Sequence, residues 1–574
     1  MRYLAFATDY DGTLAHHGLV PEAALKALKR AKESGRQLIL VTGRELEDLM
    51  KVFPEYAVFD RIVAENGALL FCPATREETV LGEAPSPALV KRLKELGVTP
   101  LSVGRSIVAT WSPNEQVVLD AIRALGLELQ VIFNKGAVMV LPSGINKASG
   151  LRAALAELSL SSHNALAIGD AENDHALISE CELGIAVSNA LPTLQERADW
   201  VTRGVASEGV CEIIEDLVTS DLIGLQPRLA RHDVAIGTSG DGDGDGKPVT
   251  LHPYGRRVLL CGASGSGKST LATAFFEALL EKHYQFCLVD PEGDFDAVEA
   301  ALVLGDQQKA PNVDEIVGVL KSADKSVVAN LIAVPFDERN AFLVQLLARC
   351  SELRARTGRP HWFVIDEAHH MIPEGDVKVP DPIAYAPSGL MLITVHPERI
   401  AKSVLANIDT LIVVGQGAHE AVESFAKLVG AKAPLEADYG TVGSGQALIW
   451  AWRDEPLPRL FTPAPPKLTR HRHRRKYAAG ELGEDKSFFF RGPHDQLKLR
   501  AQNLMLFLQI GDGVDDATWL HHLRQHDYSG WIRGSIKNPE LAEAIAAIEQ
   551  DEGSAGTSRK LIREAIEKVY TLPA

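Results

Sequence analysis

Cysteine is scarce in this chain of 574 residues, and its hydrophobic runs are short. The six cysteines form neither a CxxC pair nor a zinc-like cluster with histidines, which argues against a disulfide scaffold or a zinc finger. No apolar run approaches the roughly 18 residues that a membrane-spanning helix needs. The N-terminus lacks the hydrophobic stretch of a signal peptide. These absences predict a soluble, cytoplasmic protein with buried, reduced thiols.

Basic residues are outnumbered by acidic ones: the chain has 59 Lys and Arg and 76 Asp and Glu, which gives a net charge of −17. This balance argues against a protein that coats DNA or an anionic membrane through its overall charge, although a local basic site remains compatible with it. A hydrophobic content of 46% with 24% charged residues is ordinary for globular proteins. At roughly 150 residues per domain, the length predicts three or four domains.

The order of strand-like and helix-like runs predicts an α/β protein with a helical tail. Short β-rich runs alternate with amphipathic helical runs over residues 1–224, as in doubly wound α/β domains. A second α/β region covers 225–462, and a mostly helical region covers 488–574. Between these two, residues 463–487 combine a Pro-Ala-Pro-Pro stretch with a basic cluster, which predicts a linker.

Two aspartates follow the first predicted strand, in Asp9-Tyr-Asp11-Gly-Thr. They stand at the edge where open α/β sheets bind ligands. One carboxylate can act as a nucleophile on phosphorus and form an aspartyl-phosphate. The other can protonate the leaving oxygen and then activate water. This pattern therefore indicates a phosphoryl-transfer site.

Three further elements fall where such a site needs them. Thr42, in Thr-Gly-Arg after the second predicted strand, offers a hydroxyl group to phosphate. Lys147 opens a predicted helix, where it can neutralise phosphoryl charge. The segment Gly169-Asp170-Ala-Glu-Asn-Asp174 follows a later strand and supplies carboxylates for Mg²⁺, which prefers oxygen ligands.

In these four motifs the first 220 or so residues resemble the haloacid dehalogenase (HAD) superfamily, most of all its Cof-type, sugar-phosphatase-like branch with a C2 cap. The resemblance implies a Rossmann-like domain with a small α+β cap at about 80–142. It implies that Asp9 is the nucleophile and Asp11 the general acid/base, and that Thr42 and Lys147 hold the phosphoryl group. A catalytically inactive scaffold is the alternative, and the cap matches no specificity pattern.

The same resemblance implies a magnesium site. Asp9, the Asp11 carbonyl and Asp170 would hold Mg²⁺, and Asp174 would be a supporting acidic residue. Asn173 would be a phosphate contact or a support for the metal ligands.

A second phosphate-binding motif lies in the second α/β region. Residues 262–270 follow an apolar strand at 257–261, precede a helical run at 271–281, and fit G-x-x-x-x-G-K-[ST]. Glycines allow backbone N–H groups to surround the phosphates, the lysine reaches the β and γ oxygens, and the serine after it ligates Mg²⁺. The residues assigned to nucleotide are Gly262, Ser264, Gly265, Ser266, Gly267, Lys268, Ser269 and Thr270.

An apolar strand ending in Asp366-Glu367 completes this ATP site. Asp366 is placed to bind Mg²⁺ and Glu367 to polarise the attacking water. Strand-like segments lie between the two motifs, which is typical of RecA-like, hydrolysing ATPases. Thr394 and His396 end the next strand, where a γ-phosphate sensor lies. The alternative is that Thr394 and His396 have no sensor role and only mark the point where a strand passes into a loop.

With Leu288-Val-Asp-Pro-Glu-Gly-Asp294, these motifs resemble the HerA/FtsK-like ATPases over roughly 233–460. The resemblance implies ATP as cofactor and a homo-oligomer, with a ring as one form. The chain lacks the β-barrel that HerA proteins carry before the ATPase, which puts DNA translocation in doubt. Arg399 is one candidate among several for an arginine finger.

Three remaining features have a plain interpretation and a sharper alternative. The Asp-Gly repeat at 239–246 predicts a hairpin turn or flexible loop rather than a calcium site, because the EF-hand glutamate is missing. The basic cluster 471–476 predicts a solvated linker or docking strip more than a nucleic-acid contact. In the tail, His521 and His522 point to different helix faces, which favours a helical core anchored by tryptophans over a metal site.

The sequence thus predicts a bifunctional enzyme, in which an ATP-binding and hydrolysing domain gates, assembles or feeds a Mg²⁺-dependent phosphomonoesterase. Its expected partners are a small phosphorylated substrate, ATP and further copies of itself, with nucleic acid not favoured and no membrane. One alternative is a nucleic-acid-processing or phage-defence ATPase whose HAD domain removes phosphate from nucleic-acid ends or nucleotides. In another, the ATPase domain serves only assembly.

Overall fold

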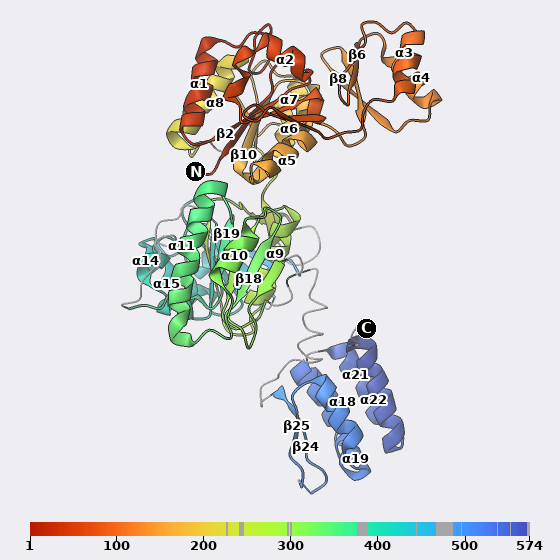
Figure 1. Cartoon of the computed structure of the whole chain (residues 1–574). Coiled ribbons are helices and arrows are strands. Elements are labelled where there is room, and N and C mark those ends of the chain that lie inside the picture. The colour runs from red at the N-terminus through yellow and green to blue at the C-terminus, as the bar shows by residue number, and fades with distance from the viewer. Residues whose placement is uncertain are drawn as a thin grey trace. The chain divides into compact units, whose positions relative to one another are not determined.

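A computed structural model describes residues 1–225, 228–239, 246–295, 298, 301–375, 389–443, 445–466, 486–494, 496–536, 538–550 and 553–570. The chain divides into two compact units, Met1–Ala464 and Pro465–Ala574. The first unit contains both predicted α/β domains (Figure 1). In the described part of the chain, no helix has the length and apolar character that crossing a bilayer requires. The basic cluster 471–476 lies outside the described residues.

The first sheet has eight strands in the order β12-β11-β10-β1-β2-β3-β4-β5, of which β4 and β5 are antiparallel to their neighbours. The strands are β1 (Ala5–Thr8), β2 (Gln37–Val41), β3 (Arg61–Ala64), β4 (Leu69–Cys72), β5 (Glu77–Val80), β10 (Ala165–Gly169), β11 (Leu183–Ala186) and β12 (Trp200–Val201). The accompanying helices are α1 (Glu22–Glu33), α2 (Leu46–Val52), α5 (Lys147–Glu157), α6 (His175–Glu180), α7 (Pro192–Arg197) and α8 (Ser207–Ser220).

Alternate residues of β1 explain why helices cover both faces of this sheet. Phe6 packs into one buried cluster with Leu28 of α1 and Ile213 of α8. Ala7 packs on the opposite face, in a cluster with Leu151 of α5. Successive strand side chains point to opposite faces, so a strand buried on both sides is apolar throughout.

A small α+β lobe is inserted between β5 and α5. Its four-stranded antiparallel sheet has the order β6-β7-β9-β8, and helices α3 and α4 pack on it (Figure 1). The elements are α3 (Pro87–Glu95), β6 (Ser102–Val103), β7 (Val108–Trp111), α4 (Glu115–Ala124), β8 (Leu129–Asn134) and β9 (Ala137–Pro142). The range expected for the cap, about 80–142, contains this lobe.

The second sheet has eleven strands in the order β14-β13-β23-β22-β21-β15-β20-β19-β16-β18-β17. The seven strands from β21 to β17 in this order pair in parallel. The other four strands, β22, β23, β13 and β14, continue the sheet beyond β21, and each pairs antiparallel with its neighbour. The strands are β13 (Val234–Thr238), β14 (Pro248–Leu251), β15 (Arg257–Cys261), β16 (Phe286–Asp290), β17 (Ala301–Leu304), β18 (Ser326–Asn330), β19 (Trp362–Ile365), β20 (Leu390–Thr394), β21 (Thr410–Val414), β22 (Ala447–Trp450) and β23 (Arg459–Pro463).

The helices of this domain are α9 (Lys268–Glu281), α10 (Val313–Leu320), α11 (Arg339–Thr357), α12 (Ala368–Met371), α14 (Lys402–Leu405), α15 (Ala418–Val429) and α16 (Glu436–Tyr439). The α/β class predicted for both regions is confirmed. One strand, β20, separates β15, which leads into the phosphate-binding loop, from β19, which leads into Asp366. At the Asp-Gly repeat, β13 pairs with β14 and Ser239 N–H donates to the Lys247 carbonyl at 2.8 Å, while 240–245 lie outside the described residues.

The two sheets of the first unit meet through the edges at which their parallel strands begin. Asn164, directly before β10, donates to the Gly358 carbonyl at 3.4 Å, and its Oδ1 lies 3.2 Å from Nε2 of His361, directly before β19. The buried Arg359 guanidinium donates to the Ser159 carbonyl at 2.8 Å. Strand ends, and the motifs that follow them, therefore lie at the sheet edges opposite to this junction.

A buried carboxylate lies at the centre of the junction. Glu182, directly before β11, accepts hydrogen bonds from Arg2 on Oε1 and from the Tyr284 hydroxyl on Oε2, both at 2.6 Å. His163 Nδ1 lies 2.8 Å from Oε2, and its ring stacks on Tyr284 with centroids 3.7 Å apart. Burial acts to raise the pKa of Glu182, but His163 and Arg2 hold that pKa well below its usual range.

The second unit, at the C-terminus, is helical as predicted, with a small hairpin added before the helices. Its elements are β24 (Phe488–Phe490), β25 (Leu499–Ala501), α18 (Leu504–Gly513), α19 (Asp516–Arg524), α20 (Asp527–Trp531), a π-helical turn (Ile532–Ile536), α21 (Pro539–Gln550) and α22 (Ala555–Tyr570). Trp519 and Trp531 are core residues. His522 is buried and accepts the Arg491 N–H, and the described histidines of this unit form no three-ligand cluster.

Gly358 offers a test of the junction, because it ends α11 with φ = 68° and a Cβ there would lie 2.2 Å from Asn164 Nδ2. We expect Gly358→Ala to lower the free energy of unfolding by about 2–4 kcal/mol, from the left-handed conformation plus the steric clash. Gly430→Ala is the matched control, since Gly430 ends α15 at φ = 71° with open space around its Cβ position. Equal losses in the two variants, measured by urea unfolding, would show that the contact across the junction is unimportant.

Candidate active site

Four neighbouring strands of the first sheet bring the N-terminal motifs together. Asp9, Thr42 and Asp170 directly follow β1, β2 and β10, and residues 65–67 follow β3. Because these strands are parallel and adjacent, their carboxyl ends meet at one edge of the sheet. The sequence predicted this meeting point for the first three.

A buried lysine links two of the carboxylates. Lys147 is 1% exposed, and its Nζ donates to Asp9 Oδ1 and to Asp174 Oδ1, both at 2.6 Å. The other Asp174 oxygen accepts the N–H groups of Asp170 and Ala171 at 2.9 and 3.0 Å. Both Asp174 oxygens are therefore engaged, and this residue orients Lys147 toward Asp9.

Local structure fixes the position of Lys147. Asn146 caps α5 by accepting the Ser149 N–H at 3.0 Å, and this cap makes Lys147 the first residue of the helix. A Cβ on Gly67, at φ = 110°, would lie 1.9 Å from the Asn146 carbonyl oxygen. Only glycine permits so close an approach of the loop after β3 to the start of α5.

The environment of Asp9 affects its protonation. Burial raises the pKa of Asp9 to about 8, although the Lys147 ammonium opposes this shift. A bound divalent cation would favour the ionised form that a nucleophile needs.

The carboxyl-end edge of this sheet also offers oxygen atoms that could bind a cation. Carboxylate oxygens of Asp9, Asp170 and Asp174 lie within 4.8 Å of one another. The Lys135 ammonium lies 2.6 Å from Asp170 Oδ2 and 3.2 Å from the Asp11 carbonyl oxygen, so a positive charge already lies between two of the oxygens predicted to hold Mg²⁺. Such an all-oxygen donor set suits Mg²⁺.

Asp11 has its side chain engaged elsewhere. Arg44 donates to both Asp11 oxygens, at 2.7 and 2.8 Å, and also to Asp48 at 2.6 Å. Arg44 itself stands just after Thr42, whose Oγ1 accepts the Arg44 N–H at 3.1 Å. Arg44 and Lys135 are therefore two cationic side chains at the site that the sequence analysis did not single out.

Asn66 is a further site residue that the sequence analysis missed. Its Oδ1 accepts a hydrogen bond from Asn173 Nδ2 at 2.9 Å, while the buried Asn66 Nδ2 and Asn173 Oδ1 have no partner. An unpaired buried donor beside Thr42 and Lys147 suits a phosphate oxygen. The signal for it is Asn66-Gly67 with positive φ at the end of β3, a strand that was not predicted.

Glu65 connects this edge to the lobe. Its buried carboxylate accepts the N–H groups of Arg105 and Ser106 at 2.9 Å and of Ile107 at 3.3 Å. These three donors belong to the turn between β6 and β7, so one side chain at the sheet edge holds a loop of the lobe.

The phosphate-binding loop connects β15 to α9, as predicted. Lys268 Nζ donates to the Gly262 and Ala263 carbonyls at 2.9 and 3.0 Å, and burial lowers its pKa. A Cβ on Gly262 would lie 2.3 Å from the Val414 carbonyl, and the buried Ser266 hydroxyl has no partner. The loop comprises Gly262, Ser264, Gly265, Ser266 and Gly267, and Ser269 and Thr270 stand in the first turn of α9.

Asp366 and Glu367 follow β19 at the same edge. Burial and the neighbouring Asp290 raise the pKa of Asp366 well above its usual range. Glu367 has a left-handed backbone (φ 42°, ψ 48°), a strain typical of functional positions, and burial raises its pKa as well. Thr394, at the end of β20, lies 3.0 Å from His369 Nδ1 and stands between the two motifs.

Two further residues of this domain are Asp290, which ends β16 in the segment quoted for the HerA/FtsK resemblance, and Arg399, the candidate arginine finger. Asp290 organises its own segment, because its carboxylate accepts the N–H groups of Gly293, Asp294 and Phe295 at 2.8–3.1 Å. Arg399 has an exposed side chain on a short 3-10 turn after β20.

Comparison with known proteins identifies the first domain. A family model described as haloacid dehalogenase-like hydrolase matches residues 6–99 and 123–214. The phosphoglycolate phosphatase of Methanothermobacter thermautotrophicus is 30% identical over 224 residues, which cover 37% of this chain and 96% of that protein. The chain belongs to the haloacid dehalogenase-like hydrolases. Its first domain is a phosphatase domain of that family.

Other relatives match the same part of the chain. The phosphoglycolate phosphatase 2 of Saccharolobus solfataricus is 29% identical over 224 residues, 38% of this chain and 92% of that protein. Among solved structures, a haloacid dehalogenase-like hydrolase from Bacteroides thetaiotaomicron is 21% identical, covers 38% of this chain and 99% of that chain, and has a TM-score of 0.34.

A second family model, described as AAA domain, matches residues 254–382. It spans the phosphate-binding loop and Asp366-Glu367. The second domain is therefore an ATPase-like P-loop domain of AAA type, while its closer kinship to HerA and FtsK stays a prediction.

Glu65→Ala tests the connection between the sheet edge and the lobe. The variant leaves three N–H groups of the β6–β7 turn without their acceptor, so we expect a loss of about 2–4 kcal/mol of stability and faster amide exchange at 105–107. Hydrogen–deuterium exchange measures the effect. Glu78→Ala, which removes an exposed partner of Arg105, is the control and leaves the exchange unchanged. Unchanged exchange in Glu65→Ala would contradict the assigned role.

Proposed function

We propose that the first domain is a Mg²⁺-dependent phosphomonoesterase that acts on a small phosphorylated carboxylic acid, with 2-phosphoglycolate as the first candidate. The observation that carries the proposal is the buried Asp9–Lys147–Asp174 network, with Lys135 of the lobe reaching its open side. Asp9 attacks phosphorus and forms an aspartyl-phosphate. Asp11, which both pairs with Arg44 and follows β1 beside Asp9, has to leave this guanidinium to protonate the leaving oxygen and then activate water.

The remaining residues bind and orient the phosphoryl group. Lys147 balances its charge, and the Thr42 hydroxyl and the free Asn66 amide donate to its oxygens. The Asp9 and Asp170 carboxylates and the Asp11 carbonyl would hold Mg²⁺, which supplies charge neutralisation of the phosphoryl oxygens.

The choice of a carboxylic acid rests on the cations around the open side of this site. Lys135, at the turn between β8 and β9, pairs with Asp170, and Arg44 pairs with Asp11, so two cationic side chains border the open side. If Asp170 and the Asp11 carbonyl held Mg²⁺, Lys135 would lose these partners and would be available for a second anionic group. The names of the two archaeal relatives point to the same kind of substrate.

We further propose that the second domain hydrolyses ATP and gates the phosphatase. Lys268 and Ser269 would bind the phosphates and Mg²⁺, and Glu367 would orient water. Helix α9 starts at Lys268, and the residues just after its end contact the phosphatase domain: the Lys282 carbonyl lies 2.6 Å from His163 Nε2. Homo-oligomerisation and a cytoplasmic location belong to the proposal as implications of the family resemblance and the composition.

Single substitutions should separate the two activities. Asp9→Asn removes the nucleophile, so we expect phosphate release from 2-phosphoglycolate to fall at least about 10³-fold while ATPase activity persists. Lys268→Ala should abolish ATP binding and leave the Asp9 chemistry in place. Phosphate release is measured over sugar phosphates, phosphorylated carboxylic acids, nucleotides and phosphorylated oligonucleotides, with and without ATP. Full activity in Asp9→Asn would refute the nucleophile, and activity confined to oligonucleotide ends would refute the substrate class.

Lys135→Ala tests the substrate class directly. We expect KM for 2-phosphoglycolate to rise about 10–100-fold, because one charge-assisted contact to the carboxylate is lost. A phosphate ester without a carboxylate should show a much smaller change in KM. Lys91→Ala, on the exposed face of α3 in the same lobe, serves as the control. Equal effects of Lys135→Ala on both substrates would exclude a carboxylate-binding role.

A further inference from the structure

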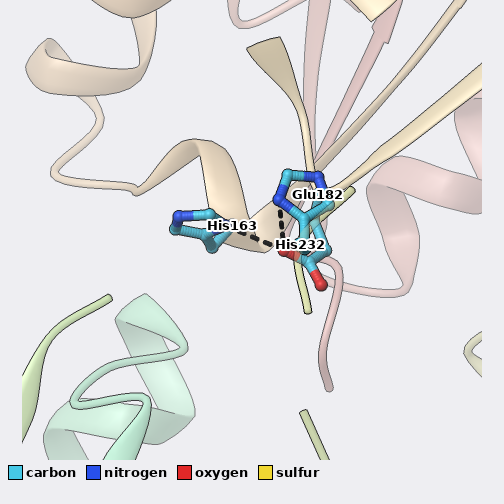
Figure 2. Close-up of side chains that lie close together, drawn as sticks. All are labelled: His163, Glu182 and His232. Carbon is cyan, nitrogen blue, oxygen red and sulfur yellow. Dashed lines mark hydrogen bonds and ion pairs between the residues drawn. The ribbon is translucent and has the colours of Figure 1, made fainter. Parts of the chain in front are cut away.

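Three side chains outside both phosphate motifs converge in the junction of the first unit (Figure 2). His163 belongs to a 3-10 turn before β10, Glu182 precedes β11, and His232 stands in the segment that enters β13. Their ligand atoms lie within 4.8 Å of one another. His163 Nδ1 lies 2.8 Å and His232 Nδ1 lies 3.9 Å from the same carboxylate oxygen, Glu182 Oε2.

The other nitrogen of each ring defines its tautomer. His163 Nε2 lies 2.6 Å from the Lys282 carbonyl oxygen, and His232 Nε2 lies 3.2 Å from the Cys181 carbonyl oxygen. A carbonyl oxygen only accepts, so each Nε2 carries the hydrogen and each neutral ring keeps its lone pair on Nδ1. Both lone pairs therefore face an oxygen that is itself an acceptor. A metal ion bound by the three atoms would resolve this arrangement.

The separations between the three ligand atoms can be compared with those around a tetrahedral metal ion. Zinc bonds of about 2.0–2.1 Å place neighbouring ligand atoms of a tetrahedral site about 3.3–3.4 Å apart. The observed separations of 2.8 and 3.9 Å each differ from this value by about 0.5 Å, so small side-chain shifts would accommodate the ion. Imidazoles whose second nitrogen donates to a backbone carbonyl are the usual supporting pattern around metal-bound histidine. Arg2 binds the other Glu182 oxygen, Oε1, and so leaves Oε2 facing the histidines.

We propose that His163 Nδ1, His232 Nδ1 and Glu182 Oε2 bind a divalent transition-metal ion, with Zn²⁺ as the expected species. Two imidazoles and one carboxylate suit Zn²⁺, whereas Mg²⁺ prefers the all-oxygen set at Asp9 and Asp170. The Tyr284 hydroxyl, from the ATPase domain, donates to the same Oε2 at 2.6 Å. The ion would fasten the segment entering β13, and with it the start of the ATPase domain, to the phosphatase domain.

The test measures metal binding rather than catalysis. Tag-free full-length protein is stripped with a chelator, and Zn²⁺ or Co²⁺ is then titrated in excess Mg²⁺, which occupies the all-oxygen sites. We expect one tightly bound equivalent per chain, a visible absorption band of four-coordinate cobalt, and two imidazoles in the X-ray absorption spectrum of the zinc form. We also expect the melting temperature to rise on reloading.

His232→Ala removes one ligand and should weaken binding at least about 10-fold. His252→Ala is the matched control, because His252 pairs with Asp233 next to the cluster without belonging to it, and it should bind like the wild type. Should His232→Ala fail to fold, the cobalt and X-ray spectra of the wild type decide. Failure of the wild type to retain one equivalent, equal binding by His232→Ala, or spectra without imidazole would overturn the proposal.

Discussion

The buried carboxylate of Glu182 is the interaction on which the arrangement of the first unit depends. It collects Arg2 from the start of the chain, His163 from the phosphatase domain and Tyr284 from the ATPase domain. A buried carboxylate is tolerated only when its partners satisfy it, and removing one partner of such a group typically costs about 3–5 kcal/mol. The ATPase domain therefore supplies a hydrogen-bond donor, Tyr284, to a buried carboxylate of the phosphatase domain. This contact helps to explain why the two domains form one compact unit.

This junction determines where the chemistry can take place. It uses the edges at which the parallel strands begin, so both sets of motifs lie at the opposite, outer edges of their sheets. The net charge of −17 gives no general attraction for phosphorylated ligands. The cations available locally are Lys147, Lys135 and Arg44 at one edge, each paired with an aspartate, and Lys268 at the other.

The sequence predicted those parts of the sites that depend on local order along the chain. Asp9, Thr42 and Asp170 each directly follow a strand, and parallel pairing brings such residues together without further information. Lys135 and Asn66 were missed for a physical reason: one reaches the site from a hairpin of the lobe, and the other follows a strand whose short apolar run was not recognised. The cluster of His163, Glu182 and His232 was not predicted either. Its successive members are 19 and 50 positions apart, and this spacing matches no metal-binding motif or helical or strand period.

Helix α9 runs from the phosphate-binding loop to the junction with the phosphatase domain. The first residue of α9 is Lys268, and the carbonyl of Lys282, just past the end of the helix, contacts His163. Its 14 residues span about 21 Å as a rigid rod. The proposed gating would use this contact, because His163 lies just before β10 and Asp170 directly follows β10 in the phosphatase site.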